Sequence, residues 1–265
     1  MIDGGSDRMR NPARERLTNG ERALGVGLRQ ARTVDIAAIM ATAGFDWLFL
    51  DLEHGTMPLD IATQISVAAL GAGITPIVRV PKGQYSLATR ALDGGALGIV
   101  MPHVDTAEEA REVVAHLKYP PAGHRSVAGG MAYFGFRAVP IGEAAATMNA
   151  ETLIVVMLET PQAVENADAI AAVTGVDVLL IGTNDLAMEM GIAGQFDHAR
   201  VVGAYERVIA ACQKHGKWPG MGGVYSEPLL SKYSALGMRM LLAGNDLSFL
   251  MGAATARAKF LREMK

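Results

Sequence analysis

Short apolar runs alternate with longer, alanine-rich helical patterns along almost the whole chain, from about Ala23 onward. The apolar runs have strand length, and they predict strands at residues 23–28, 47–51, 75–80, 96–101, 152–158, 176–181, 220–224 and 239–243. Helical patterns lie between them at residues 34–43, 59–71, 85–92, 107–117, 163–172, 199–214 and 229–236, and a last long helix is expected at residues 247–264. None of the intervening segments has the composition of a linker, so residues 21–265 are predicted to form a single domain.

Strands that alternate with helices form a parallel sheet, because each helix carries the chain back to start the next strand in the same direction. Eight such units in a chain of 265 residues match a (β/α)8 barrel, which takes about 250 residues. An open doubly wound sheet would call for a phosphate-binding fingerprint. Gly71 and Gly73 are followed by Pro76 where a dinucleotide motif needs its third glycine. We therefore predict an α/β fold of the (β/α)8, or TIM barrel, type.

The first twenty residues are predicted to be an N-terminal extension with one short helix. Asn11 followed by Pro12 indicates a helix cap with proline in the first turn, and Gly20 indicates the end of that helix. The segment carries charges but no apolar core, which is unlike a secretory signal. Cys212 is the single cysteine and lies among apolar neighbours, so it is expected to be a buried thiol in a reducing compartment. We expect the protein to be cytoplasmic.

The composition narrows the classes of function. Half of the residues are hydrophobic and 19% are charged, so a sizeable buried core is expected. A net charge of -3 gives no basic footprint for nucleic acid and no cationic face for a membrane surface. No apolar stretch approaches the ~20 residues of a membrane span. These features favour small-molecule chemistry, with no nucleic-acid or membrane partner.

Polar side chains follow nearly every predicted strand, at the end where a barrel of this type carries its chemistry. The clearest stretch is GFDWLFLDLEHGT, residues 44–56, in which a buried apolar run ends in Asp51, Glu53 and His54. The other strand ends supply Arg29, Arg79, His103, Glu159, Asn184 with Asp185, Tyr225, and Asn245 with Asp246. Because the strand interiors stay apolar, this recurrence predicts a polar site at one end of the barrel.

Glu159 and Asp185 form the sharpest pair of candidates. Glu159 follows the fifth predicted strand and Asp185 follows the sixth, and neighbouring strands lie about 4.8 Å apart, so the two carboxylates can converge on one point. Two such carboxylates without cysteine ligands suit a hard divalent cation, with Mg2+ or Mn2+ as the first candidates and Co2+ as a further one. Alternatively, Glu159 caps a helix near Pro161 and Asp185 caps a helix at residues 186–190.

Arg79 and His54 are the candidate catalytic side chains. A fixed guanidinium at the barrel mouth can hold a carboxylate or stabilise an oxyanion, although a salt bridge between Arg79 and Asp51 is an alternative. His54 is the candidate proton carrier because the ordinary pKa of histidine lies near neutrality. His103 and His124 are weaker candidates. Glu53 is expected to point away from its neighbours and to be structural.

One segment, residues 119–150, breaks the alternation of strands and helices. It is rich in Gly, Pro and aromatic residues and shows no clear strand. Loops of this length are often functional, so the segment is predicted either to cover the site or to be a surface excursion packed by Tyr133, Phe134 and Phe136.

Several ordered motifs resemble those of a known family. They are FDWLFLDLEHG at residues 45–55, PIVRVP at 76–81, YPPAGHR at 119–125, VVMLETPQA at 155–163 and GVDVLLIGTNDLAMEMG at 175–191. Together they resemble the HpcH/HpaI family of metal-dependent class II pyruvate aldolases, which includes hydroxy-oxo-heptanedioate and keto-deoxy sugar acid aldolases. The resemblance runs from about Gly27 to the final helix. It implies a (β/α)8 barrel whose C-terminal helix is exchanged between the subunits of a dimer, commonly within a homohexamer.

The resemblance also implies roles for individual residues. Glu159 and Asp185 would be the metal ligands, and Arg79 would contact the carbonyl oxygen of the pyruvyl group. His54 would be the catalytic base or its partner, with Asp51 beside it ordering water at the metal.

Further residues match the family at the edge of the site. From its own neighbours, Asp93 is expected to end a helix. It matches a family aspartate that pairs with the histidine at position 54, and this pairing is expected either within one subunit or across a subunit boundary. The loop of Gly182, Thr183 and Asn184 matches the backbone that holds the substrate carboxylate. Arg125 follows the YPPAG segment and, with Arg29, is a candidate substrate contact.

Two departures from the family pattern concern the substrate. Many family members carry Gln two residues before the metal glutamate, where this chain has Met157, and Pro-Ala before the metal aspartate, where it has Thr183 and Asn184. Both metal ligands are kept, so the implied reaction is unchanged.

The predicted function is a carbon–carbon lyase that cleaves a 4-hydroxy-2-oxo acid reversibly to pyruvate, or hydroxypyruvate, and an aldehyde. A Schiff-base mechanism would need a lysine inside the barrel, and no predicted strand contains one. One alternative is an acyl-CoA lyase of the citryl-CoA or malyl-CoA type, which would want a basic patch for the CoA phosphates. The other is a barrel without catalysis that serves in binding or assembly.

Overall fold

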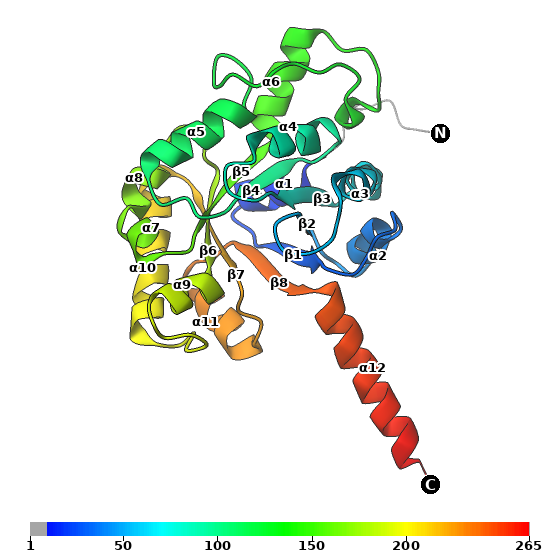
Figure 1. Cartoon of the computed structure of the whole chain (residues 1–265), viewed down its shortest axis with the longest axis vertical. Coiled ribbons are helices and arrows are strands. Elements are labelled where there is room, and N and C mark those ends of the chain that lie inside the picture. The colour runs from blue at the N-terminus through cyan, green and yellow to red at the C-terminus, as the bar shows by residue number, and fades with distance from the viewer. Residues whose placement is uncertain (1–9, 265) are drawn as a thin grey trace.

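The computed structural model describes residues 10–264, and the first nine residues of the predicted extension lie outside this range. Within it, eight parallel strands form one closed barrel in which each strand pairs with the next and β8 pairs with β1 (Figure 1). The strands are β1 Ala23–Leu28, β2 Trp47–Asp51, β3 Thr75–Arg79, β4 Gly98–Met101, β5 Leu153–Leu158, β6 Val178–Gly182, β7 Trp218–Gly222 and β8 Met240–Asn245. The predicted (β/α)8 barrel is confirmed.

Helices surround the barrel. They are α1 Pro12–Thr18, α2 Ile36–Thr42, α3 Leu59–Ala72, α4 Tyr85–Asp93, α5 Ala107–Leu117, α6 Ile141–Glu151, α7 Pro161–Glu165, α8 Ala167–Ala171, α9 Thr183–Glu189, α10 Ala199–His215, α11 Glu227–Leu236 and α12 Asp246–Glu263, with a short 3-10 helix, η1, at Ala132–Phe134.

The strands are apolar on both faces because the barrel buries both. Along β2, Trp47 and Phe49 point into the barrel interior, whereas Leu48 and Leu50 belong to the layer between the strands and the helices. The Trp47 ring lies over Gly25 of β1, where an added Cβ would come within 2.1 Å of it, so that interior position has room only for glycine.

Helix α1 closes the amino-terminal end of the barrel. The Asn11 side chain caps it by accepting the N–H of Arg14 at 3.1 Å, as the sequence predicted. Ala13 and Leu17 are buried in the same cluster as the interior residue Trp47. The predicted helix is therefore present, but it packs into the barrel core instead of standing outside it.

The irregular segment between α5 and β5 lies at the amino-terminal end of the barrel, far from the strand ends that carry the candidate site (Figure 1). It does not cover the mouth of its own barrel. Tyr133 and Phe134 pack in a separate buried cluster with Tyr119, which fits the second of the two predictions, while Phe136 is exposed. The segment also contains α6, a helix that was missed because its Gly- and Pro-rich flanks dominated the pattern.

Two other boundaries differ from the prediction for visible reasons. The helix expected at residues 163–172 is broken into α7 and α8 at Asn166, whose side-chain amide donates to the Asp105 carbonyl at 2.8 Å. Strand β7 ends at Gly222 because Gly223 takes a left-handed conformation, with φ +88°, that leaves the sheet.

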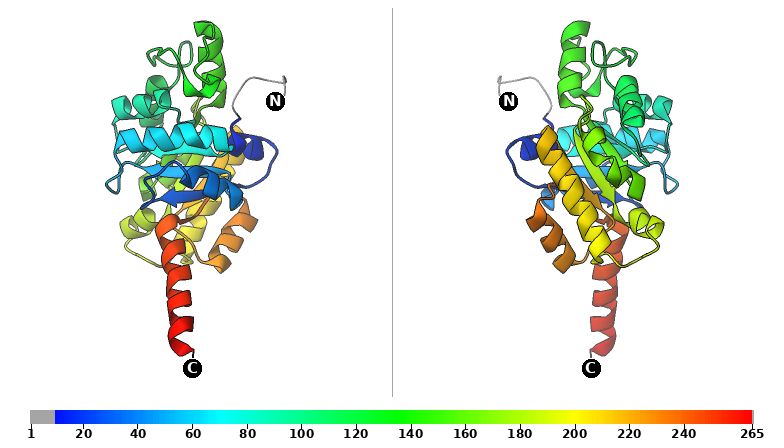
Figure 2. Two further views of the ribbon diagram at one scale, coloured as in Figure 1. Left: turned by 90° about the vertical axis from the view of Figure 1, so that its right-hand side faces the viewer. Right: turned by 90° about the vertical axis from the view of Figure 1, so that its left-hand side faces the viewer.

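Helix α12 projects away from the barrel, and no residue of it is buried (Figure 2). Its exposed side chains include large apolar residues, among them Leu250, Met251, Phe260 and Leu261. In the described part of the chain no helix combines the length and hydropathy needed to cross a membrane.

Candidate active site

Most of the predicted site residues line one cavity at the carboxyl ends of the strands. The cavity has a volume of about 650 Å³, which includes its solvent-open mouth. Eight of the predicted residues form part of its wall: Arg29, Asp51, His54, Arg79, Gly182, Thr183, Asn184 and Asp185. Met157, Tyr225 and Asn245 line it as well, so the strand ends converge as expected.

Glu159 is buried, with 1% of its surface exposed, at the end of β5. Burial raises the pKa of its carboxyl group to about 7, the hydrogen bond from the backbone of His103 opposes the rise, and the nearby Asp185 carboxylate adds to it. Two acidic groups therefore lie close enough for their charges to repel each other. A divalent cation would remove the repulsion that this arrangement creates.

The surroundings of Glu159 fit such a cation. Its Oε2 accepts the backbone N–H of His103 at 2.8 Å, while no donor among residues 10–264 is bonded to Oε1. The side chain lies against Gly182, where an added Cβ would come within 2.6 Å of Oε1. The glycine thus makes space for a carboxylate with one oxygen held and one available as a ligand.

The two carboxylates are the candidate metal ligands at this point. Across residues 10–264, no three His, Cys, Asp or Glu side chains gather closely enough to hold a metal ion by themselves. A cation held by Glu159 and Asp185 would complete its coordination with water and substrate oxygens, which is the usual arrangement for Mg2+.

Arg79 is held by two carboxylates. Its Nε and NH2 bond to Asp51 at 3.0 and 2.5 Å, and its NH1 lies 3.1 Å from Glu53. The salt bridge to Asp51, considered as an alternative role, is therefore present. It also holds the guanidinium plane at the cavity wall, with two of its five N–H donors bonded to Asp51 and NH1 beside Glu53, and the other donors are available to a ligand.

These contacts stabilise the ionised form of the Asp51 carboxyl group. Burial by itself raises the pKa of this carboxyl group, but the bonds and charge of Arg79 and the backbone N–H groups of His54 and Glu53 outweigh it and hold the pKa below its ordinary value. Glu53 faces Arg79 and approaches the Nε2 of His54 at 3.9 Å. The prediction that it points away from its neighbours is wrong, because the turn after β2 brings it back.

His54 stands at the rim of the cavity with 58% of its side chain exposed. Its backbone N–H donates to Asp51 Oδ1 at 3.1 Å, which fixes the position of the residue relative to Arg79. The imidazole is accessible from the solvent side, as a group that exchanges protons with a substrate needs to be.

Gly182, Thr183 and Asn184, which were predicted to hold the substrate carboxylate, all line the cavity, but the side chains of Thr183 and Asn184 differ in direction. The Thr183 hydroxyl is bonded to the Tyr205 hydroxyl and to the Gly222 carbonyl, both at 2.7 Å. This side chain is turned into the barrel wall and is structural. The Asn184 side chain is exposed beside Gly223.

Asp93 and Arg125 do not join the other candidates within one chain. Asp93 ends α4, and Arg125 follows α5, so both lie at the amino-terminal end of the barrel. The Arg125 guanidinium bonds to Asp93 at 2.6 Å and stacks over the Tyr119 ring at 4.6 Å. Within a single subunit, Asp93 therefore does not pair with His54, and Arg125 is not a contact for substrate in the cavity.

Comparison with known proteins agrees with this geometry. A model of the HpcH/HpaI aldolase/citrate lyase family matches residues 29–231, which include the cavity residues from Arg29 to Tyr225. The chain belongs to the HpcH/HpaI aldolase family.

Relatives within the HpcH/HpaI family share most of the chain. A 4-hydroxy-4-methyl-2-oxoglutarate aldolase of Hapsidospora irregularis is 41% identical over 91% of this chain and 90% of its own. A hydroxypyruvate/pyruvate aldolase of Delftia acidovorans is 35% identical over 93% and 90%. The crystal structure of an HpcH/HpaI aldolase from Desulfitobacterium hafniense DCB-2 superposes with a TM-score of 0.89 at 32% identity, over 95% of this chain and 97% of the other.

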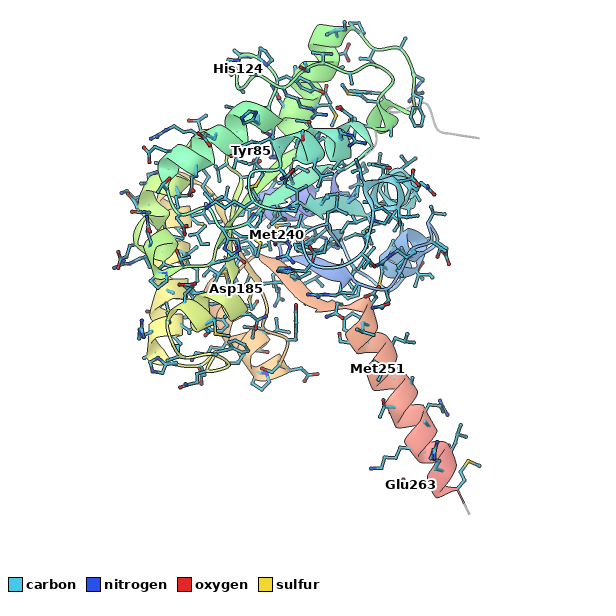
Figure 3. All side chains as sticks on the ribbon, in the orientation of Figure 1. Tyr85, His124, Asp185, Met240, Met251 and Glu263 are labelled. Carbon is cyan, nitrogen blue, oxygen red and sulfur yellow. The ribbon has the colours of Figure 1, made fainter. Side chains whose placement is uncertain are left out.

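The sequence underrated one residue of this HpcH/HpaI site. His103 has a left-handed backbone, with φ +51°, which is uncommon for a residue other than glycine. This conformation turns its N–H toward Glu159 and places Nδ1 3.3 Å from the same oxygen. By contrast, Figure 3 shows His124 at the end of the barrel opposite to Asp185. One indication for His103 was present in the sequence, namely its position directly after β4. A residue in a solvated turn would occupy the same position, so the sequence could not separate the two cases.

Proposed function

We propose that the protein is a divalent-metal-dependent aldolase that cleaves a 4-hydroxy-2-oxo acid reversibly to pyruvate, or hydroxypyruvate, and an aldehyde or ketone. The observation that carries the proposal is that Glu159 and Asp185 lie close together at the ends of the neighbouring strands β5 and β6, beside a cavity that Asp185 and the fixed guanidinium of Arg79 line. The aldolase names of the family relatives support the same reaction class.

Glu159 and Asp185 would hold the cation, with Mg2+, Mn2+ and Co2+ as the candidates. When bound, such a cation supplies Lewis-acid polarisation of the carbonyl group of the 2-oxo acid. Glu159 is prepared for this role because the His103 N–H already holds its Oε2, while its Oε1 lies beside Gly182 of the cavity wall.

Arg79 and His54 would handle the charge and the proton of the reaction. In the cleavage direction, the bond between C3 and C4 breaks, its electron pair remains on the pyruvyl fragment as an enolate, and the proton of the 4-hydroxyl leaves. The N–H donors of Arg79 that are not bonded to Asp51 would stabilise the enolate oxygen. His54 would accept the hydroxyl proton, and Asp51 orients both residues by bonding to the guanidinium and to the His54 backbone.

The backbone around Gly182, Thr183 and Asn184 would hold the carboxylate of the 2-oxo acid. This role rests on the family match of the loop and on its place in the cavity wall beside Asp185. The Thr183 side chain takes no part in it.

Removal of the metal tests the proposal. Purified protein treated with EDTA should lose pyruvate formation from a 4-hydroxy-2-oxo acid and should recover it on addition of Mg2+ or Mn2+. Turnover that survives thorough chelation would contradict the role of Glu159 and Asp185. The same assay with CoA thioesters addresses the acyl-CoA lyase alternative, which predicts thioester cleavage and no cleavage of the free 2-oxo acids.

The subunits would assemble through α12. An 18-residue helix with no buried residue and with an apolar face needs a partner surface, and an exchange of α12 between the subunits of a dimer, within a hexamer, would supply it. In such an assembly Asp93, held by Arg125, would reach His54 of a neighbouring subunit. Sedimentation should therefore show an oligomer, and the pair Leu250→Glu and Leu261→Glu should dissociate it; a monomer in the unmodified protein would contradict the exchange.

The compartment we propose is the cytoplasm. Cys212 is buried, and burial raises the pKa of its thiol to about 12, so it is an unreactive thiol that suits a reducing environment.

A further inference from the structure

The junction of β6 and α9 contains Asp185 and touches Glu159. Gly182, the last residue of β6, lies against the Glu159 side chain, and Asp185 stands in the first turn of α9. Thr183 lies between Gly182 and Asp185 and is fully buried. A change in the backbone at Thr183 would therefore shift Asp185 relative to Glu159.

The Thr183 hydroxyl makes two hydrogen bonds whose directions can be assigned. It lies 2.7 Å from the Gly222 carbonyl oxygen and 2.7 Å from the Tyr205 hydroxyl. A carbonyl oxygen can only accept, so the Thr183 hydroxyl donates its one proton to Gly222 and must accept from Tyr205. Tyr205 thus donates to Thr183, and Thr183 donates to the end of β7.

Tyr205 is held in place on α10. It is fully buried, and its ring stacks on the ring of Tyr233 of α11 with the centroids 3.7 Å apart. Burial raises the pKa of the Tyr205 hydroxyl group, so the group keeps its proton and remains a donor. Within the described residues, Thr183 is the one hydrogen-bond partner of this hydroxyl. The packed ring therefore holds its donor against the Thr183 oxygen.

The bonded series Tyr205, Thr183 and Gly222 ties the turn after β6 to the end of β7. The next residues of the two turns also pack closely, because a Cβ added to Gly223 would come within 3.0 Å of the Asn184 side chain. The wall that carries Asp185 is thus held to its neighbour by bonds as well as by packing. Side chains that support a ligand in this way keep its geometry close to the productive one.

We propose that Tyr205 is a positioning residue for the metal site, because its hydroxyl, acting through Thr183, fixes the turn that carries Asp185 next to Glu159. This role rests on the proposed function and assigns it a residue that touches neither the cation nor the substrate. Loss of the hydroxyl keeps the ring and its stacking on Tyr233. It leaves the Thr183 oxygen without its donor, so the turn can relax and the two carboxylates are less well placed for a cation.

The affinity for Mn2+ tests the role of Tyr205. Calorimetric titration of the metal-free protein should give a dissociation constant about tenfold higher for Tyr205→Phe than for the unmodified protein, as is usual when a residue that supports a metal ligand is lost. Thr183→Val removes both bonds and should raise the dissociation constant at least as much. Adding Tyr205→Phe to Thr183→Val should change little further, since the two residues act through one bond. Thr183→Ser keeps the hydroxyl and should recover most of the affinity.

Tyr233→Phe is the matched control. Tyr233 is as deeply buried as Tyr205 and belongs to the same stacked pair, but its hydroxyl donates to the Phe196 carbonyl. The control also removes a buried hydroxyl, so it should lower the unfolding temperature by a similar amount while the dissociation constant for Mn2+ stays within about twofold. An equal loss of affinity in Tyr205→Phe and Tyr233→Phe, or an unchanged affinity in Tyr205→Phe, would overturn the role.

The pair Thr183→Val and Thr183→Ser gives the same test without a change at Tyr205. Equal affinities in these two variants would also overturn the role, so the test is decided even if Tyr205→Phe does not fold.

The unmodified protein distinguishes this role from the proposed function. If it binds Mn2+ and needs the metal for turnover, while Tyr205→Phe binds Mn2+ equally tightly, the positioning role alone is wrong. If the unmodified protein neither binds Mn2+ nor needs a divalent metal for turnover, the proposed function is wrong and the role of Tyr205 is wrong as well.

Discussion

Both ends of the barrel contain buried charges, and at the amino-terminal end the described residues bond Asp177, Arg14 and Lys118 to partners within the chain. There Asp177 accepts from Arg14 and from the Ile154 N–H, both at 2.8 Å. The Lys118 ammonium donates to the Asn149 and Thr152 carbonyls, both at 2.7 Å. This network joins α1, the segment before β5 and the turn before β6, and it leaves little for a ligand to bind.

The carboxyl-terminal end of the barrel contains the same types of charged residue, but their charges are not all paired within the described chain. Glu159 keeps one oxygen without a donor, Asp185 lies close enough to raise its pKa, and the Arg29 guanidinium is unpaired within the described residues. The comparison teaches that burial of charge does not by itself mark a site. A closed network, in which every charged group has a partner, stabilises the fold. An open network, which leaves some groups without a partner, can bind a ligand, but it lowers the stability of the fold.

The largest effect is expected from the open carboxylate pair. Glu159→Gln and Asp185→Asn should each lower turnover by on the order of 10³-fold, because the cation loses a charged ligand. The metal-free Glu159→Gln protein should unfold at a higher temperature than the unmodified protein, since a buried acidic group is replaced by a neutral one. Metal-stimulated kcat and thermal unfolding after chelation are the measurements, and full metal-stimulated turnover in Glu159→Gln would contradict the assignment.

Arg79→Lys should reduce kcat/KM by about 10²-fold. A lysine is a point charge and cannot bond to Asp51 through two parallel N–H groups while it also contacts Glu53 and a substrate oxygen. Steady-state kinetics with saturating Mn2+ provides the measurement. Near-normal turnover would show that Arg79 is only a structural partner of Asp51.

A change at the closed end should affect stability and not chemistry. Asp177→Ala leaves Arg14 and Lys118 without their carboxylate, and it should cost about 3 kcal/mol of unfolding free energy. Burial already lowers the pKa of Lys118 to about 8, and the Asp177 charge opposes that shift, so the variant makes the lysine still harder to protonate. Denaturant titration measures the loss; kcat at a temperature where the variant is folded should stay within about twofold.

The smallest effect is a pH dependence of metal binding. The pKa of Glu159 is raised from an ordinary 4.5 to about 7, so the folded protein binds more protons than the unfolded chain between these values. The metal-free fold therefore loses stability as the pH rises through this window. A cation must displace the proton, so its affinity should rise by about tenfold per pH unit below pH 7 and level off above it. Calorimetric titration with Mn2+ from pH 5.5 to 8 checks this, and a flat profile would contradict it.

Local patterns were sufficient to predict the barrel. The continuous apolar run from Trp47 to Leu50 and the proline-containing run before Arg79 place β2 and β3 at the predicted positions to within one residue. The strand ends then pointed to Glu159, Asp185, Arg79 and His54, because side chains at the carboxyl ends of parallel strands converge in a closed barrel. Helix α6 was missed although its own residues favour a helix, because the Gly- and Pro-rich residues on either side of it made the whole segment resemble a loop.

The sequence alone determined the order of strands and helices, the family, and which residue types stand at the barrel mouth, because these depend on periodicity and on position along the chain. Only the tertiary structure decided which charges are matched. It turned Glu53 toward Arg79, brought the His103 backbone to Glu159, paired Arg125 with Asp93 at the far end, and left the Arg29 guanidinium without a partner among residues 10–264. These outcomes depend on contacts between side chains that are far apart in the sequence. A hydrogen bond needs its donor and acceptor atoms within about 3 Å of each other, and the closure of the barrel, not a local sequence pattern, sets that distance.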